Sequence, residues 1–182
     1  MTAQSSDEAL MLAVAEGDGK ALRSLMDRYM GRSIKLAERV GAWDGEEVAQ
    51  EAFVRVWKHA ARFDARRAKF TTWLYRIVVN LALDRPRRKH ANIDDVPEVA
   101  SREPGAEENM LAAQRQRLAD MALATLPERQ RAAIALFYLD GLSGREAATV
   151  LEVSEKAFES LLSRGKAACR AFIAAAQQGE RK

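Results

Sequence analysis

Residues 44–60, DGEEVAQEAFVRVWKHA, place their apolar side chains three and four positions apart, which is the spacing of one face of an α-helix. Asp44 and Glu47 have the spacing of a capping box, so we expect the helix to begin there. The apolar stripe comprises Val48, Ala49, Ala52, Phe53, Val56, Trp57 and Ala60. This stripe predicts a helix packed on other helices, with Phe53 and Trp57 in the core rather than on a contact surface.

The same spacing recurs along nearly the whole chain, and no segment alternates with period two for long. It predicts helices over residues 8–16, 22–40 and 71–85, the last ended by Pro86, and then over residues 110–124, 127–139, 144–151 and from 155 onward. Ser143 and Glu146 form a second capping box, and Ser154 can cap the last helix. The last two helices are typical of a helix-turn-helix, although helical bundles contain similar hairpins.

The formal net charge of +3 conceals three blocks of different sign. Residues 1–92 carry a net charge of +5, residues 93–110 a net charge of −5, and residues 111–182 a net charge of +3. We therefore predict an all-α protein of two small helical domains, residues 1–92 and 110–182, joined by an acidic flexible linker over residues 93–109. Within the first domain, residues 62–90 hold nine basic and two acidic side chains. This excess of positive charge predicts either a binding surface for an acidic polymer or an ordinary basic face in contact with solvent.

Several function classes are disfavoured by composition. No apolar run approaches the length of a membrane span, and the acidic N-terminus is unlike a signal peptide. The chain has a single cysteine, Cys169, so it cannot form an internal disulfide. Together with the two histidines, His59 and His90, this cysteine is not enough for a metal cluster. No pattern of a nucleophile with its base, or of a glycine-rich phosphate loop, is present. We expect a cytoplasmic protein that is not an enzyme, with no catalytic residues, no metal, no cofactor and no small-molecule substrate.

Three segments, taken in order, resemble the extracytoplasmic-function (group IV) sigma factors of the sigma-70 family. The first is residues 46–57, with its acidic pair, Gln50-Glu51, Phe53 and Trp57. The second is residues 70–80, followed by Asp84 and Arg87-Arg88, and the third is residues 126–131 with 141–148 and 160–164. The resemblance covers about residues 7–172 apart from the linker. It implies that residues 1–92 are sigma region 2 and residues 110–182 are sigma region 4.

The resemblance implies a subunit that binds core RNA polymerase and directs promoter-specific initiation, nucleoid-associated when active. The polymerase contacts would be the clamp helices of the largest subunit and the flap. For the clamp helices the motif carries over to Glu47, Gln50, Glu51 and Arg55. The residue pattern alone is equally compatible with a solvated helix face bearing an ordinary Glu51–Arg55 pair.

Two DNA surfaces are implied as well. The family's minus-ten segment, with the loop at residues 62–70 that would capture a flipped base, maps to Phe70, Thr72, Arg76, Asn80, Arg87, Arg88 and Lys89. Its minus-thirty-five reading helix maps to Lys156, Glu159, Ser160, Ser163, Arg164 and Lys166. Glu159 stands where the family commonly has a basic residue, and Leu161 where it has arginine, so the preferred sequence of this reading helix is open.

The resemblance also implies control by an anti-sigma factor that covers the polymerase-facing surfaces of both domains. Two alternatives remain at this point. One is a sigma-like mimic that does not initiate transcription, and the other is a one-component helix-turn-helix regulator that binds duplex DNA without polymerase. The sequence leaves open whether the two domains touch in the free protein.

Overall fold

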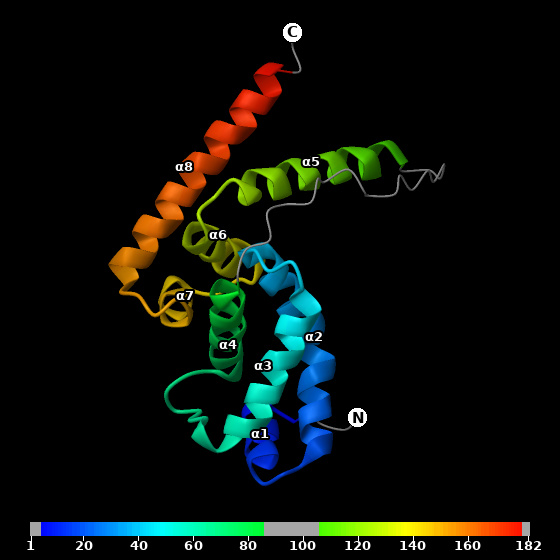
Figure 1. Cartoon of the computed structure of the whole chain (residues 1–182), viewed down its shortest axis with the longest axis vertical. Coiled ribbons are helices and arrows are strands. Elements are labelled where there is room, and N and C mark those ends of the chain that lie inside the picture. The colour runs from blue at the N-terminus through cyan, green and yellow to red at the C-terminus, as the bar shows by residue number, and fades with distance from the viewer. Residues whose placement is uncertain (1–4, 86–105, 180–182) are drawn as a thin grey trace.

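The computed structural model describes residues 5–85 and 106–179, and within these ranges the chain is helical and contains no strand. The first half consists of α1 (Asp7–Ala15), α2 (Gly19–Val40), α3 (Gly45–His59) and α4 (Phe70–Asp84), with the 3-10 turn η1 (Ala60–Arg62) after α3. The second half consists of α5 (Ala106–Ala124), α6 (Glu128–Ile134), α7 (Gly144–Val150) and α8 (Glu155–Gly179), with a π-helical turn η2 (Ala135–Leu139) after α6. The predicted all-α fold is confirmed (Figure 1).

The first half is a bundle in which α2 packs against α1, α3 and α4. Its core contains Leu25, Leu36, Val48, Phe70 and Leu74, all fully buried. The apolar stripe of α3 packs inward as the spacing predicted, with one exception. Trp57 is 42% exposed, whereas Phe53 is 2% exposed, so the prediction that Trp57 belongs to the core was wrong.

Local signals set the ends of α2 and α3. The Asp18 carboxylate accepts hydrogen bonds from the amides of Lys20 (2.7 Å) and Ala21 (3.3 Å), which begins α2. Gly41 ends α2 with a backbone φ of 126°, which residues that carry a side chain rarely adopt.

Asp44 precedes α3, but its side chain makes no capping hydrogen bond. It forms an ion pair with Arg85 at the end of α4 instead. The predicted capping box at this helix was therefore wrong, because a guanidinium offers the carboxylate a stronger, charge-assisted bond than a backbone amide does.

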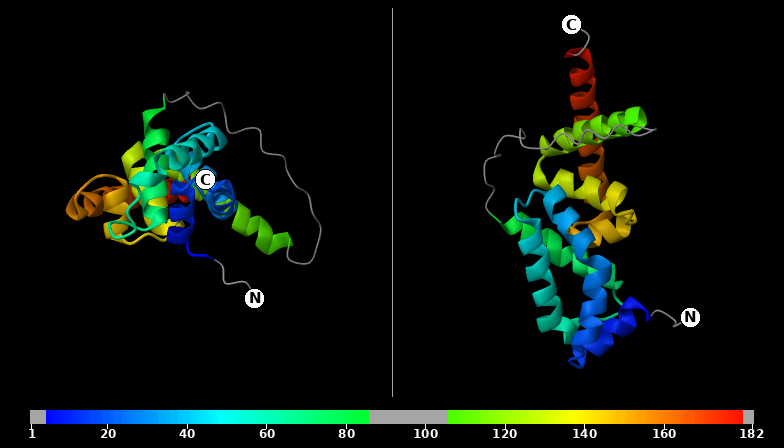
Figure 2. Two further views of the ribbon diagram at one scale, coloured as in Figure 1. Left: turned by 90° about the horizontal axis from the view of Figure 1, so that it is seen from below. Right: turned by 90° about the vertical axis from the view of Figure 1, so that its right-hand side faces the viewer.

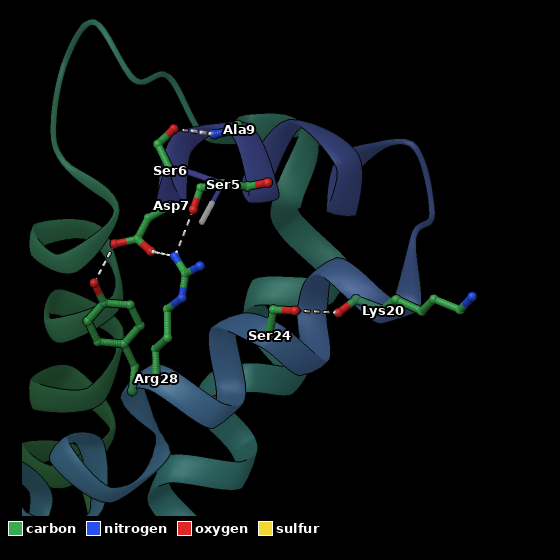
Figure 3. Close-up of polar contacts among 8 residues, drawn as sticks. Ser5, Ser6, Asp7, Ala9, Lys20, Ser24 and Arg28 are labelled. Carbon is green, nitrogen blue, oxygen red and sulfur yellow. Dashed lines mark hydrogen bonds and ion pairs between the residues drawn. The ribbon is translucent and has the colours of Figure 1, made fainter. Parts of the chain in front are cut away.

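Helix α1 is fixed to α2 through Asp7 (Figure 3). Its carboxylate accepts a hydrogen bond from Arg28 Nη1 at 2.7 Å and another from the Tyr29 hydroxyl. Burial, followed by the hydrogen bond with Asp7, raises the pKa of Tyr29 to about 12. The first helix is thus anchored by charge as well as by its buried residues Met11 and Val14.

The second half contains the predicted helix-turn-helix, formed by α7 and α8. The capping box at Ser143 and Glu146 is present, and the Ser154 hydroxyl accepts from the amide of Ala157 at 3.2 Å. Helix α5 begins at Ala106, so the last four residues of the predicted linker are helical, and residues 93–105 lie outside the described part of the chain. The C-terminal part of α8 projects away from the other helices (Figures 1 and 2).

The two halves pack against each other. Helix α4 contacts α7, and α2 contacts α6 and η2. Buried residues of both halves, such as Val79 in α4 and Ala147 in α7, belong to one continuous apolar cluster. The question that the sequence left open is therefore answered for this structure: the domains are in contact.

Candidate polymerase and nucleic-acid interfaces

The outward side of α3 carries all four residues that the resemblance assigned to polymerase. Gln50 and Arg55 are exposed, and Arg55 Nε donates to Glu51 Oε1 at 3.0 Å, four residues earlier on the helix. Glu47 is also exposed and lies 3.3 Å from Arg85 Nη1 through its Oε2. The structure therefore brings these four side chains onto one accessible helix face, which we call the α3 face.

An apolar groove continues from this face. It has a volume of about 450 Å³ and lies between α2 and α3, and its lining residues are Gly19, Leu22, Met26, Gln50, Phe53, Val54 and Trp57. Gln50 belongs to both surfaces, so the groove and the α3 face are contiguous.

Sequence reasoning missed two members of this groove, Val54 at 43% and Trp57 at 42% exposure. The signal was available, because Gln50, Val54 and Trp57 follow each other at steps of four and three. These steps place the three residues along one line of the helix surface, beside its buried stripe, where Val54 and Trp57 stay exposed.

Helix α4 presents only part of the set assigned to the minus-ten element. Phe70 is fully buried, with its ring edge-on to Tyr29 at a centroid distance of 5.5 Å, and Thr72 is 4% exposed. Neither side chain is available to DNA in this arrangement. Arg76 is exposed and Asn80 is partly exposed. Arg87, Arg88 and Lys89 lie outside the described residues.

The loop between η1 and α4 keeps its basic side chains in solvent. Asp64 accepts hydrogen bonds from the amide of Arg66 at 3.0 Å and from its guanidinium at 3.1 and 3.2 Å, and these bonds lower the pKa of Asp64. Arg67 is exposed as well. At the base of the loop, Phe63 packs against Trp73 with a ring-centroid distance of 5.5 Å. An aromatic pair thus lies at the base of a cationic loop.

Two cations of this region are engaged by carboxylates from the second half. Lys69 Nζ lies 2.8 Å from Glu146 Oε1, and Arg76 forms an ion pair with Glu152. The hydrogen bond from Lys69, followed by those from Ser143, lowers the pKa of Glu146 to about 2.

Five of the six residues assigned to the minus-thirty-five element share one exposed side of α8. Lys156, Glu159, Ser160, Ser163 and Arg164 are all exposed and follow steps of three and one, which places them along a single helix face. Arg164 Nε donates to the carbonyl of Ser160 at 3.2 Å.

The flanks of this exposed side of α8 are partly buried. Lys166 lies 5.8 Å from the centre of the Tyr138 ring. Leu161 packs against the core, so it lies to one side of this exposed helix face.

Other kinds of site find no support in the described residues. Within residues 5–85 and 106–179, no three His, Cys, Asp or Glu side chains are grouped so that they could hold a metal ion. No helix in that same part of the chain is long and apolar enough to cross a membrane. The single cysteine, Cys169, is half-buried on α8, and burial raises the pKa of its thiol.

Both halves match known families. Residues 18–92 match Sigma-70 region 2, and residues 116–169 match Sigma-70 region 4. The ECF RNA polymerase sigma factor SigW of Bacillus subtilis (strain 168) is 31% identical over 171 residues, which is 86% of this chain and 91% of SigW. The ECF RNA polymerase sigma-E factor of Escherichia coli (strain K12) is 33% identical over 181 residues, which is 92% of this chain and 94% of the relative.

The fold agrees with these matches. A solved structure of CnrH in complex with the cytosolic domain of CnrY is similar with a TM-score of 0.69 at 29% identity, and the alignment covers 94% of this chain and 99% of the other. Sequence relatives matched over nearly their whole length, together with a shared fold, establish the family. The chain belongs to the ECF sigma factors of RNA polymerase, with sigma-70 region 2 in its first half and region 4 in its second.

Proposed function

We propose that this chain binds core RNA polymerase through α3 and directs promoter-specific initiation at minus-ten and minus-thirty-five elements. The observation that carries the proposal is the pairing of the α3 face with the adjacent apolar groove. Stable protein interfaces combine a desolvated apolar centre with a polar rim, and this surface offers both. The groove would receive apolar side chains, and Gln50 at its edge would hydrogen-bond at the rim.

The clamp helices of the largest polymerase subunit are the partner that fits this surface. A groove between two antiparallel helices accepts a ridge of side chains from a third helix. The carboxylates of Glu47 and Glu51 favour basic residues on that helix, and Arg55 favours an acidic one. Since these charges are exposed, they would steer association and fix orientation more than they add affinity.

At the minus-ten element, the cationic loop and the exposed end of α4 would hold single-stranded DNA. Arg66 and Arg67 suit phosphates, and binding through them would weaken as salt rises because counterions are released. Asn80 can hydrogen-bond to a base edge, and Trp73, half-buried against Phe63, offers a ring on which an extruded base could stack. Arg87, Arg88 and Lys89 would extend the phosphate contacts.

At the minus-thirty-five element, α8 would lie in the major groove. Arg164 can bind the acceptors of guanine, and Glu159 can accept from the amino group of cytosine, while Ser160 and Ser163 bond to either kind of base edge. Lys156 and Lys166 would contact phosphates. The carboxylate of Glu159 repels phosphate, so this chain would require a cytosine at the facing position more strictly than a relative with a basic residue there.

The likeness to CnrH, solved in complex with the cytosolic domain of CnrY, supports a protein partner for this chain, and we propose that this partner is an anti-sigma factor. We propose that such an anti-sigma factor covers the α3 face and the groove, because those surfaces are then unavailable to polymerase. Co-purification of the chain with an endogenous protein, released when polymerase binds, would support this control. A chain that is fully active from the start of expression would contradict it.

The decisive experiment is reconstitution with purified core polymerase. The chain and core are mixed with fragmented genomic DNA, and the 5′ ends of the transcripts are sequenced. We expect co-elution with core and starts that share two motifs separated by a fixed spacer. Co-elution without any shared start would favour a non-initiating mimic. Duplex binding without polymerase association would favour a one-component regulator.

A further inference from the structure

Two cations beside the proposed minus-ten surface are paired with carboxylates of the chain itself. Lys69, directly before α4, and Arg76, two turns into α4, both pair with glutamates of region 4. We propose that Glu146 and Glu152 stand in for DNA phosphates in the free protein and hold the two regions in an autoinhibited arrangement that DNA must open. This inference rests on the proposed function, because it assumes that Lys69 and Arg76 belong to the DNA-binding surface.

Glu146 is held in position before any contact with Lys69. One of its oxygens, Oε2, accepts from the Ser143 hydroxyl at 2.7 Å and from the Ser143 amide at 2.9 Å. The other, Oε1, is left for Lys69 at 2.8 Å. A carboxylate oriented by a helix cap loses little conformational freedom when it binds a cation, so it competes well with a mobile phosphate.

Glu152 occupies an unusual backbone position. It follows α7 with a φ of 55°, and among the described residues it is the one non-glycine with positive φ. Glycine is the common residue at such a helix end, and a side chain there has a steric cost of about 1 kcal/mol. Here the position carries a glutamate that pairs with Arg76 across the boundary between the regions.

The ion pairs sit at the margin of an apolar contact. Helices α4 and α7 pack together, and the buried residues of both belong to the same cluster. While it is paired with Glu152, the Nη2 atom of Arg76 is not free for a close contact with a phosphate. In the proposed autoinhibition, a DNA strand makes close contacts with this side of α4 once the carboxylates leave and region 4 moves away.

The first test uses a charge-removing variant and a matched control. Glu152→Gln removes the ion pair with Arg76, whereas Glu155→Gln removes the same charge from an ion pair with Arg145 inside region 4, where the atoms lie 3.1 Å apart. The probe is a fluorescein-labelled single-stranded DNA of random sequence and about 20 nucleotides, followed by anisotropy at low salt. Both pairs are about half exposed or more, so the effect is modest.

We expect Glu152→Gln to raise the association constant about two- to fivefold, and Glu155→Gln to leave it within about 1.5-fold. An equal rise in both variants would show that only net charge changed, and no rise in either would show that the ion pair does not compete with DNA. Both outcomes overturn the inference. If wild-type chain initiates transcription while Glu152→Gln behaves like wild type, the inference fails and the proposed function stands.

A second test needs no substitution. A carbodiimide joins a carboxylate to an amine only when the two are in contact, and the Lys69–Glu146 pair meets this condition. We expect a cross-linked peptide containing both residues in the free chain, and at least a fivefold lower yield when the same single-stranded DNA is present at saturation. An unchanged yield at saturation would mean that the closed contact persists on DNA, which refutes the proposal. Failure to join core polymerase would instead refute the proposed function.

Discussion

Replacing Trp57 by alanine is the sharpest test of the apolar groove as part of the polymerase interface. Trp57 is 42% exposed and lines the groove next to Val54. A tryptophan carries up to roughly 250 Å² of surface, so docking of a helix over the groove would remove about 100 Å² from water. At about 25 cal/mol per Å², this contributes about 2.5 kcal/mol, or about 70-fold in Kd.

The assay is titration of labelled chain with purified core polymerase, measured by anisotropy. We expect Trp57→Ala to weaken binding between about 10-fold and the 70-fold limit, because part of the area gain is offset by side chains that become ordered. Leu12→Ala is the matched control, since Leu12 is 66% exposed on α1 and does not line the groove. Its Kd should stay within about twofold of wild type.

Trp57→Ala also removes packing from the buried part of the ring, so folding has to be checked separately by circular dichroism at the assay temperature. Val54→Asp avoids this difficulty, because Val54 is 43% exposed and the carboxylate would face the groove without disturbing the core. We expect this variant to lose binding as well. Unchanged Kd values for both folded variants would refute the assignment of the groove to polymerase.

Three further predictions concern stability and pH. Asp7→Asn should lower the free energy of unfolding by about 2 kcal/mol, measured by urea denaturation, because Arg28 and Tyr29 lose the charged acceptor of their hydrogen bonds. Ser143→Ala should lower the free energy of unfolding by about 1 kcal/mol in the same assay because the helix cap is lost, and the lowered pKa of Glu146 should rise toward its ordinary value. Burial, opposed by cations of α2, raises the pKa of Asp140 to about 6, so the folded chain favours the protonated carboxyl. The contribution of Asp140 to the free energy of unfolding is therefore largest below about pH 4, and it is lost as the pH rises through 6. Between pH 5 and 7.5, the wild-type free energy of unfolding should fall more steeply than that of Asp140→Asn, and parallel curves would contradict this.

The contact between the regions explains why Asp140 is perturbed. It follows η2 in region 4, and the charges that oppose its shift, Arg32 and Arg39, come from α2 in region 2. Tyr75 of α4 faces the same carboxylate, and burial followed by the charge of Asp140 raises its pKa. A titratable group at this boundary makes the closed arrangement sensitive to pH in the direction stated above.

The sequence predicted the helices well because their signals are local. Apolar spacing along α3 and α4, the Ser143 capping box and the Ser154 cap act within a few residues, and each appears in the structure as expected. The predicted cap at Asp44 is absent because Arg85, which is distant in the sequence, offers its carboxylate a stronger, charged partner. Propensity and spacing carry no information about such a distant competitor.

The candidate surfaces also divide into features that local sequence signals predict and features that depend on distant contacts. Helical spacing places the candidate residues of α3 and α8 on shared helix faces, whereas their assignment to polymerase and DNA came from the family resemblance. The burial of Phe70 and Thr72, the exposure of Trp57 and the apolar groove depend on which helix packs where, and the sequence could not settle that.

By itself, the sequence determined that this chain is helical, that α3 and α8 each carry a polar face, and that it resembles one family. Only the tertiary structure decided that Lys69 and Arg76 face carboxylates of region 4. The reason is physical: a helix forms from contacts between near neighbours in the chain, whereas an ion pair between two domains depends on how their surfaces dock.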